Sequence, residues 1–333
     1  MNLLSIQTGH NATVGLMING RIASLLSQEK VDNVKNSSVF PTEAIRAILD
    51  QNGLDAKSID EVVIASQMIF PQHCVAPGKH EEVSDHLNPP CIVQFAKRLE
   101  EGLLGVLFSR IFQEARARRH ATLRKEGMIH LQNRLRDLNL IDKPLSFIEH
   151  HECHARGAYH ALEREHGRES LVFTLDGMGD GLCATVTRIG HDGKWTRLAE
   201  TKLNASLGSI YSETTRFLGM KVMEHEYKVM GLAAYNKGYQ LKTYQEVFEP
   251  ILAIDSANPL AFCASLDTSK FYEYLVRRAV GERFDNVAGA LQHLLEERVT
   301  QWIRNAISAT GKPSYSACKM AISPLTIIAS LAP

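Results

Sequence analysis

Three histidines lie close together in the segment EHHECHARGAYHA, which begins at Glu149. His150 and His154 are four positions apart, so on a helix both imidazoles project from one face, about one turn from each other. This is the spacing that a single metal ion needs, and neutral imidazole binds zinc, iron, cobalt or nickel better than magnesium. The same spacing also occurs on ordinary helix surfaces, so the pair alone leaves metal binding open. His151 lies on another face, and we expect it to be solvated or to support a ligand.

A carboxylate that could complete such a site follows in the segment LVFTLDGMGDG. Asp176 ends an apolar predicted strand and is followed by Gly177, Gly179 and Gly181. Glycines let backbone N–H groups approach an anion closely, and an aspartate beside them at a strand end typically faces a metal or a phosphate. The alternative is an ordinary Asp-Gly turn. The histidine pair and this segment together are more specific than either part.

The elements expected around these residues repeat one pattern. NLLSIQT is a predicted strand, a short loop with His10 follows, and two further strands flank Asn19-Gly20, a dipeptide favoured in hairpin turns because both residues tolerate positive φ. A helix ends at Gly53, and IDEVVIASQ is another strand. The segments SLVFTLDGMGDGLCATVTRIG and KWTRLAETK repeat strand, polar loop and hairpin, and a long amphipathic helix ends at Gly311. The sequence thus predicts an α/β fold made of a duplicated unit, with a cleft between two lobes.

The expected boundaries follow from this pattern. One domain covers residues 1–311, with a first lobe at about 1–145 that carries a charged helical insertion at about 85–142. The second lobe covers about 146–311. Residues 312–333 carry little charge and no clear periodicity, and we interpret them as an atypical tail, with out-of-frame sequence as one explanation. On this interpretation the second lobe is incomplete.

The composition is that of an ordinary globular protein. The chain has 333 residues, of which 44% are hydrophobic and 22% charged, and its 37 basic residues balance 37 acidic ones. This balance gives no electrostatic reason to expect nucleic acid or a membrane as a partner, and no apolar run reaches about 18 residues. The six scattered cysteines form no C-x-x-C pair, and the first residues lack the pattern of a signal peptide. We therefore expect free thiols in a reducing cytoplasm.

Four blocks of the sequence, in this order, resemble a known family of enzymes. They are GHNATVGLMINGRIASLLSQEKVDNVKNSS, EHHECHARGAYHA, LVFTLDGMGDG and EYKVMGLAAY, and they look like the O-carbamoyltransferases of the nodulation-protein-U and tobramycin-carbamoyltransferase type. The resemblance runs from residue 1 to about residue 311. It implies an actin/Hsp70-like ATPase fold with two ribonuclease-H-like lobes. It also implies transfer of a carbamoyl group from carbamoyl-adenylate to a hydroxyl of a sugar, an antibiotic or another biosynthetic product.

The resemblance also implies roles for particular residues. His150, His154 and Asp176 would bind a divalent metal, with iron as the implied ion and zinc as the alternative. His10 would take the proton from the acceptor hydroxyl, a role that suits an imidazole with a near-neutral pKa. The implied contacts to ATP or carbamoyl-adenylate are Lys35, Gly177, Gly179, Gly181 and Lys228.

Each of these roles has a simpler alternative in the sequence itself. His10 could be a loop histidine that is hydrogen-bonded to backbone. Lys35 could be an exposed lysine, and Lys228, which we place just before a helix, could be a helix-end lysine.

Full-length relatives of this type continue further along the chain. They add a strand, a glycine loop, a second carboxylate that completes the metal site, and a YrdC-like domain that makes carbamoyl-adenylate from ATP and carbamoyl phosphate. None of these is apparent here. The expected partners are therefore a small-molecule hydroxyl acceptor and, through a YrdC-like domain absent from this chain, carbamoyl phosphate and ATP. Two alternatives stay open, a non-catalytic remnant that binds metal or nucleotide and a relative of the proteins that add threonylcarbamoyl to tRNA.

Overall fold

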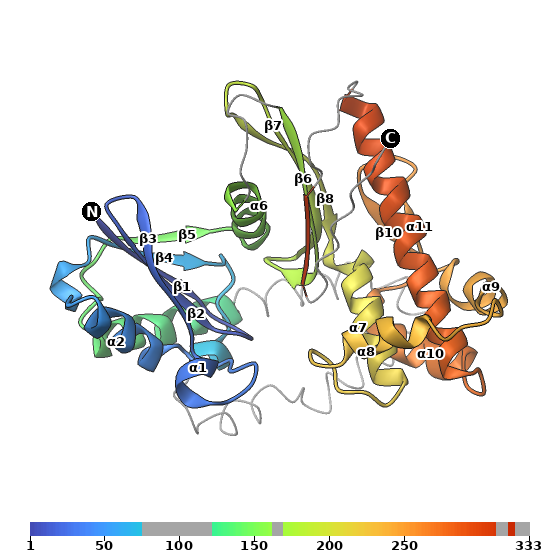
Figure 1. Ribbon diagram of the computed structural model, residues 1–333, viewed down its shortest axis with the longest axis horizontal. Coiled ribbons are helices and arrows are strands. Elements are labelled where there is room, and N and C mark those ends of the chain that lie inside the picture. The colour runs from blue at the N-terminus through green and yellow to red at the C-terminus, as the bar shows by residue number, and fades with distance from the viewer. Residues whose placement is uncertain (75–121, 162–168, 311–318, 324–333) are drawn as a thin grey trace. The chain divides into compact units, whose positions relative to one another are not determined.

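The protein divides into two compact units, Met1–Glu149 and His150–Pro333, each with its own sheet (Figure 1). Each unit also has its own hydrophobic core. The computed structural model describes residues 1–74, 122–161, 169–310 and 319–323.

The first unit is built on a five-stranded sheet with the order β3-β2-β1-β4-β5. β1, β2 and β3 pair antiparallel, whereas β4 pairs parallel with both β1 and β5. The predicted hairpin is confirmed, because Ile18 pairs with Arg21 and the two turn residues between them have φ values of 50° and 78°. The strands are β1 (Asn2–Gln7), β2 (Thr13–Ile18), β3 (Arg21–Ser27), β4 (Glu61–Ala65) and β5 (Leu145–Ile148).

One long helix and one helical segment complete the core of the first unit. The helix α2 (Thr42–Gln51) packs its apolar side, which includes Ile45 and Ile48, against the sheet. Gly53, which was predicted to mark the end of this helix, follows two residues after Gln51 and has a positive φ. A helix at residues 122–137 adds Leu131 and Leu135 to the same core. It lies within the predicted insertion, of which residues 85–121 fall outside the described part of the chain. The short helices of this unit are α1 (Glu29–Asp32), η1 (Ala56–Ser58) and η2 (Pro71–Cys74).

The second unit contains a four-stranded sheet with the order β11-β6-β7-β8. β6, β7 and β8 form an antiparallel meander, and β11 pairs parallel with β6. These strands repeat, in order and direction, four of the five strands of the first sheet. The strands are β6 (Ser170–Gly179), β7 (Leu182–Ile189), β8 (Trp195–Lys202) and β11 (Lys319–Ser323), and a separate pair is formed by β9 (Leu252–Ile254) and β10 (Phe262–Ala264).

Two boundaries differ from the expectation. Residues 146–149 belong to the first unit, because β5 pairs with β4 and not with a strand of the second sheet. The segment 312–333, which we interpreted as an atypical tail, supplies β11. The short stretch KMAIS carries too little periodicity to predict this strand, which pairs with the edge of β6.

Helices cover both faces of the second sheet. α6 (His150–His160) lies on one side of β6, and α7 (Leu207–Phe217) and α11 (Phe284–Thr310) lie on the other (Figure 1). The side chains of β6 alternate between the two faces of the sheet. Phe173 and Leu175 pack in the large core of the second unit, whereas Val172 packs with Ala155 of α6. The remaining helices are α8 (Glu226–Ala233), α9 (Gln240–Thr243), η3 (Leu203–Ala205), the π-helix η4 (Tyr244–Phe248), η5 (Thr268–Lys270) and α10 (Phe271–Arg278).

Among the described residues, none of the helices has the combination of length and apolar composition that crossing a membrane requires. The four described cysteines carry free thiols.

The core of the second unit depends on Trp302 of α11. Its ring is fully buried between Phe173 and Phe262, at ring-centroid distances of 5.0 Å to each, and its indole Nε1 donates to the carbonyl of Leu260 at 2.7 Å. Trp302→Phe keeps an aromatic ring but removes the donor and part of the packed volume. We expect the free energy of unfolding, measured in urea, to fall by about 1–3 kcal/mol. The matched control is Tyr235→Phe, because the ring of Tyr235 is exposed. We expect this variant to change the free energy of unfolding by less than about 0.5 kcal/mol, and a larger change would contradict this account.

Candidate metal centre

The helix α6 places the two predicted histidine ligands on one face. α6 begins at His150, so His154 follows after one turn, and the two imidazole centroids are 4.6 Å apart. Both side chains are partly exposed at this face of the helix. The predicted pairing of the two rings is therefore confirmed.

The strand β6 brings a carboxylate to the same place. Alternation along β6 turns Thr174 and Asp176 toward α6, since Thr174 contacts His151 and Asp176 contacts His150. β6 leaves its regular pairing with β7 after Leu175 and resumes it at Gly179. Asp176 thus lies at the point where β6 stops pairing with β7. Its side chain reaches His150 in the first turn of α6.

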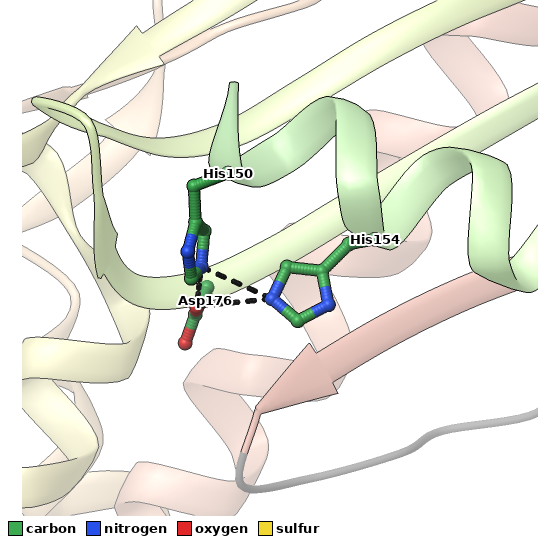
Figure 2. A group of neighbouring side chains, drawn as sticks. All are labelled: His150, His154 and Asp176. Carbon is green, nitrogen blue, oxygen red and sulfur yellow. Dashed lines mark hydrogen bonds and ion pairs between the residues drawn. The ribbon is translucent and has the colours of Figure 1, made fainter. Parts of the chain in front are cut away.

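The three side chains converge on one point (Figure 2). The Asp176 Oδ2 atom lies 2.7 Å from His150 Nε2 and 3.5 Å from His154 Nε2, and the two Nε2 atoms are 3.0 Å apart. Figure 2 shows both rings turned toward the carboxylate, from two successive turns of α6. Among the described residues these are the ones whose ligand atoms form such a group, all within 4.8 Å of one another.

This donor set fits a divalent transition metal better than it fits a hydrogen-bonded cluster. His150 Nε2 faces both a carboxylate oxygen and the other imidazole nitrogen, yet an Nε2–H can point along only one of these directions. A cation between the three atoms would take one lone pair from each of them at once. Two imidazoles and one carboxylate are also a ligand set used by zinc and by non-haem iron.

The carboxylate of Asp176 is held in its charged form. It is only 6% exposed, and burial alone would raise its pKa, but the hydrogen bonds to His150 and His154 outweigh burial and hold the pKa of this carboxyl below its usual value. Its second oxygen, Oδ1, accepts from the Gly177 amide at 2.6 Å. The site therefore offers an anionic, oriented ligand without the need to remove a proton first.

The glycines after Asp176 have different environments. A Cβ atom on Gly179 would lie 1.9 Å from the Cδ2 atom of His150, so the imidazole packs directly on the Gly179 backbone. Gly181 occupies the turn between β6 and β7 at φ +84°. Space around a Cβ on Gly177 is open. The structure thus gives Gly179 a reason to be glycine that the sequence did not reveal, namely contact with a ligand.

Two residues of this site were missed in the sequence. Ser206, which is fully buried, caps α7 by accepting from the Ser209 amide at 3.0 Å and donates to the Gly177 carbonyl at 2.7 Å. A Cβ on Gly208 would lie 2.6 Å from the Gly177 nitrogen, so the first turn of α7 packs against the backbone beside Asp176. A serine before an apolar helix is a recognisable cap signal, but nothing local indicates what the cap contacts.

His151 is not solvated, which corrects one of the two expectations for it. Its side chain is fully buried, and Nδ1 lies 2.8 Å from the Thr174 hydroxyl, which in turn lies 2.6 Å from the hydroxyl of Thr185. The sheet on which α6 packs covers this face of the helix. His151 therefore joins the helix to the strand that carries Asp176.

The remaining predicted residues lie in other elements. His10 is in the short loop between β1 and β2, where its carbonyl accepts from the Gln7 side chain at 3.4 Å. Lys35 is exposed in the loop after α1. Lys228 lies within the first turn of α8 and not before it, and its side chain is exposed. Of the predicted site residues, the structure brings together the three ligands and the glycines that follow Asp176.

Comparison with known sequences gives one consistent result. Residues 2–301 match the family described as "Carbamoyltransferase N-terminus". Nodulation protein NolNO of Sinorhizobium fredii is 25% identical over 91% of this chain and 39% of its own length. An uncharacterized protein of Synechocystis sp. is 26% identical over 68% of this chain and 33% of its own length. The chain thus spans well under half the length of these relatives.

Comparison with solved structures gives weaker similarities. YeaZ from Pseudomonas aeruginosa has 11% identity and a TM-score of 0.26, over 60% of this chain and 66% of that one. The PPX-GPPA enzyme of Aquifex aeolicus has 13% identity and a TM-score of 0.32, over 91% of this chain and 93% of that one. TM-scores this low carry no inference about the fold. The strand order of the two sheets is the evidence for it.

The contact between Gly179 and His150 can be tested by adding one methyl group. Gly179→Ala places a Cβ inside the imidazole ring and must displace His150. We expect the dissociation constant for zinc, measured with a competing chelator, to rise at least about 10-fold. Gly177→Ala is the matched control on the same strand, since its Cβ meets open space. Equal zinc affinity of the two variants would show that the ring does not need this contact.

Proposed function

Because this chain belongs to the carbamoyltransferase N-terminus family, we propose that it transfers a carbamoyl group from carbamoyl-adenylate to the hydroxyl of a sugar, an antibiotic or a similar biosynthetic product. The observation that carries the proposal is the convergence of His150, His154 and Asp176 on one point. In this proposal, a metal ion bound by these three residues would hold an anionic, phosphate-containing substrate.

The proposed fold is that of the actin/Hsp70-like ATPases, with two ribonuclease-H-like lobes. Support comes from the two sheets, in each of which a three-stranded antiparallel meander has its first strand paired parallel with a later strand. Such a repeat is the mark of a duplicated α/β unit.

The metal ligands in this proposal are His150, His154 and Asp176, with iron as the first candidate ion and zinc as the second. A divalent cation bound there would act as a Lewis acid and as a template for the phosphate of carbamoyl-adenylate. The chain's own contribution is to present two imidazoles and one ionised carboxylate in fixed positions. Gly177, Gly181, Lys35 and Lys228 are proposed contacts to the nucleotide. Gly179 was predicted for the same role, but the contact with His150 suffices to explain it.

The proposed base is His10. Its imidazole would take the proton of the acceptor hydroxyl as the hydroxyl oxygen attacks the carbamoyl carbon. A new C–O bond forms, the bond between that carbon and the phosphate oxygen breaks, and AMP leaves with the electron pair. The products are the carbamate ester and AMP, and the proton remains on His10 until solvent removes it.

The donor of the carbamoyl group is proposed to be made elsewhere. The relatives matched here are more than twice as long as this chain. We propose that a YrdC-like domain uses ATP and carbamoyl phosphate to form carbamoyl-adenylate for this chain.

The metal proposal predicts a loss of bound ion. The double variant His150→Ala, His154→Ala removes two of three ligands, so the content of iron or zinc after reconstitution should fall from about one ion per chain to about none. Elemental analysis of the purified chain measures this directly. His160→Ala, an exposed histidine at the end of the same helix, is the control and should keep its metal. An unchanged metal content in the double variant would remove this site from the proposal.

The base proposal predicts a loss of rate without a loss of metal. With preformed carbamoyl-adenylate and a panel of sugar and aminoglycoside acceptors, His10→Ala should lower the rate of AMP release about 10²–10⁴-fold. His130→Ala, in the helix at residues 122–137 of the same unit, serves as the control. Wild-type rates for His10→Ala with every acceptor that reacts would exclude His10 as the base.

A further inference from the structure

The turn between β6 and β7 does more than connect two strands. Asp180 and Gly181 form it, with φ values of 51° and 84°, and Gly179 pairs with Leu182 on either side. This is the two-residue hairpin geometry that needs positive φ at both positions. The first unit makes the same kind of turn with Asn19 and Gly20. An Asp-Gly pair therefore satisfies the backbone, but an Asn-Gly pair would serve the turn equally well.

The side chain of Asp180 reaches the metal-centre helix. Its Oδ2 atom accepts a hydrogen bond from the backbone amide of His150 at 2.8 Å, and His150 is the first residue of α6. The first amides of a helix have no partner within the helix and carry partial positive charge, so a carboxylate is a favourable partner for them. Such a cap normally comes from the residue just before the helix. Here it comes from a position thirty residues later in the chain.

The same turn also holds the ring of His150. The imidazole packs on Gly179, which has no room for a Cβ. His150 is thus held at two points, at its backbone amide by Asp180 and at its ring by Gly179. Both points belong to β6 or its turn, and β6 also carries Asp176. One hairpin therefore fixes the first histidine ligand relative to the carboxylate ligand.

We propose that Asp180 is a positioning residue of the metal centre, which sets the place of His150 relative to Asp176 through the hydrogen bond to the His150 amide. Asp180 does not coordinate the ion in this scheme. The inference rests on the proposed metal site. It adds that the affinity of the site for metal depends on the hydrogen bond that the Asp180 side chain accepts from the backbone amide of a ligand.

Two variants separate the turn from the hydrogen bond. Glycine and asparagine both tolerate the positive φ at this position, but only asparagine keeps an oxygen that can accept from the His150 amide. Asp180→Gly and Asp180→Asn therefore differ in the bond and not in the strain of the turn. Asn19→Gly makes the equivalent change in the hairpin of the first unit and is the control for the loss of a side chain in such a turn.

The experiment is a titration of the full chain with cobalt(II), followed through the visible absorption of the bound ion. We expect Asp180→Gly to bind cobalt about 10–100-fold more weakly than the wild type and to shift the absorption bands, because a displaced His150 changes the ligand geometry. Asp180→Asn should recover most of the affinity and the wild-type bands. Asn19→Gly should match the wild type in both. A purely structural role in the hairpin would lower the thermal midpoint of the metal-free chain but leave the bands in place.

The outcomes distinguish this inference from the proposal beneath it. If the wild type binds cobalt and Asp180→Gly binds it equally well with the same bands, the positioning role is overturned while the metal site stands. If Asp180→Asn is no better than Asp180→Gly, the hydrogen bond is not the cause, and the role is likewise overturned. If the wild type binds no cobalt, or binds it just as well without His150 and His154, the metal centre itself fails and the role of Asp180 falls with it.

Discussion

The nearly buried carboxylate of Asp176 constrains how α6 and β6 of the second unit pack together. Asp176 is ionised and 6% exposed, a state that a protein interior tolerates only when compensating groups face the charge. Two imidazoles of α6 and the Gly177 amide supply that compensation. Because the imidazoles are one helical turn apart, α6 must lie along β6 with its first turn at this end of the strand. The charge of Asp176 thus constrains where α6 lies along β6.

The surrounding residues keep that arrangement in place. Gly179 allows the ring of His150 to touch the strand, and His151 joins α6 to Thr174 of the same strand. On the other side of β6, Ser206 fastens the first turn of α7 to the carbonyl of Gly177. The strand segment that carries the carboxylate is therefore held from both faces of the sheet. This rigidity suits a site that must present its ligands at fixed distances.

The repetition of strand order links the two units. Each sheet has a meander in which the first strand has a later strand as its parallel neighbour. Each first strand has a candidate functional residue near its end, His10 in the loop after β1 and Asp176 within β6. These two residues bear different chemistry, an imidazole in the first unit and a carboxylate in the second. Membership of the carbamoyltransferase N-terminus family gives both positions a role in one proposed reaction.

The sequence by itself determined what depends on neighbours along the chain. The spacing of His150 and His154, the Asn19-Gly20 hairpin and the strand that carries Asp176 are all local, because helix pitch, turn dihedrals and strand alternation act over a few residues. That strand was expected to end at Asp176, but it continues to Gly179, where it pairs with Leu182. Tertiary structure decided the rest. That Asp180 caps α6, that His151 is buried and that β11 lies along β6 depend on residues brought together from distant parts of the chain. Such contacts leave no periodic trace in the sequence, since each is made by packing and hydrogen bonding between elements once those elements have formed.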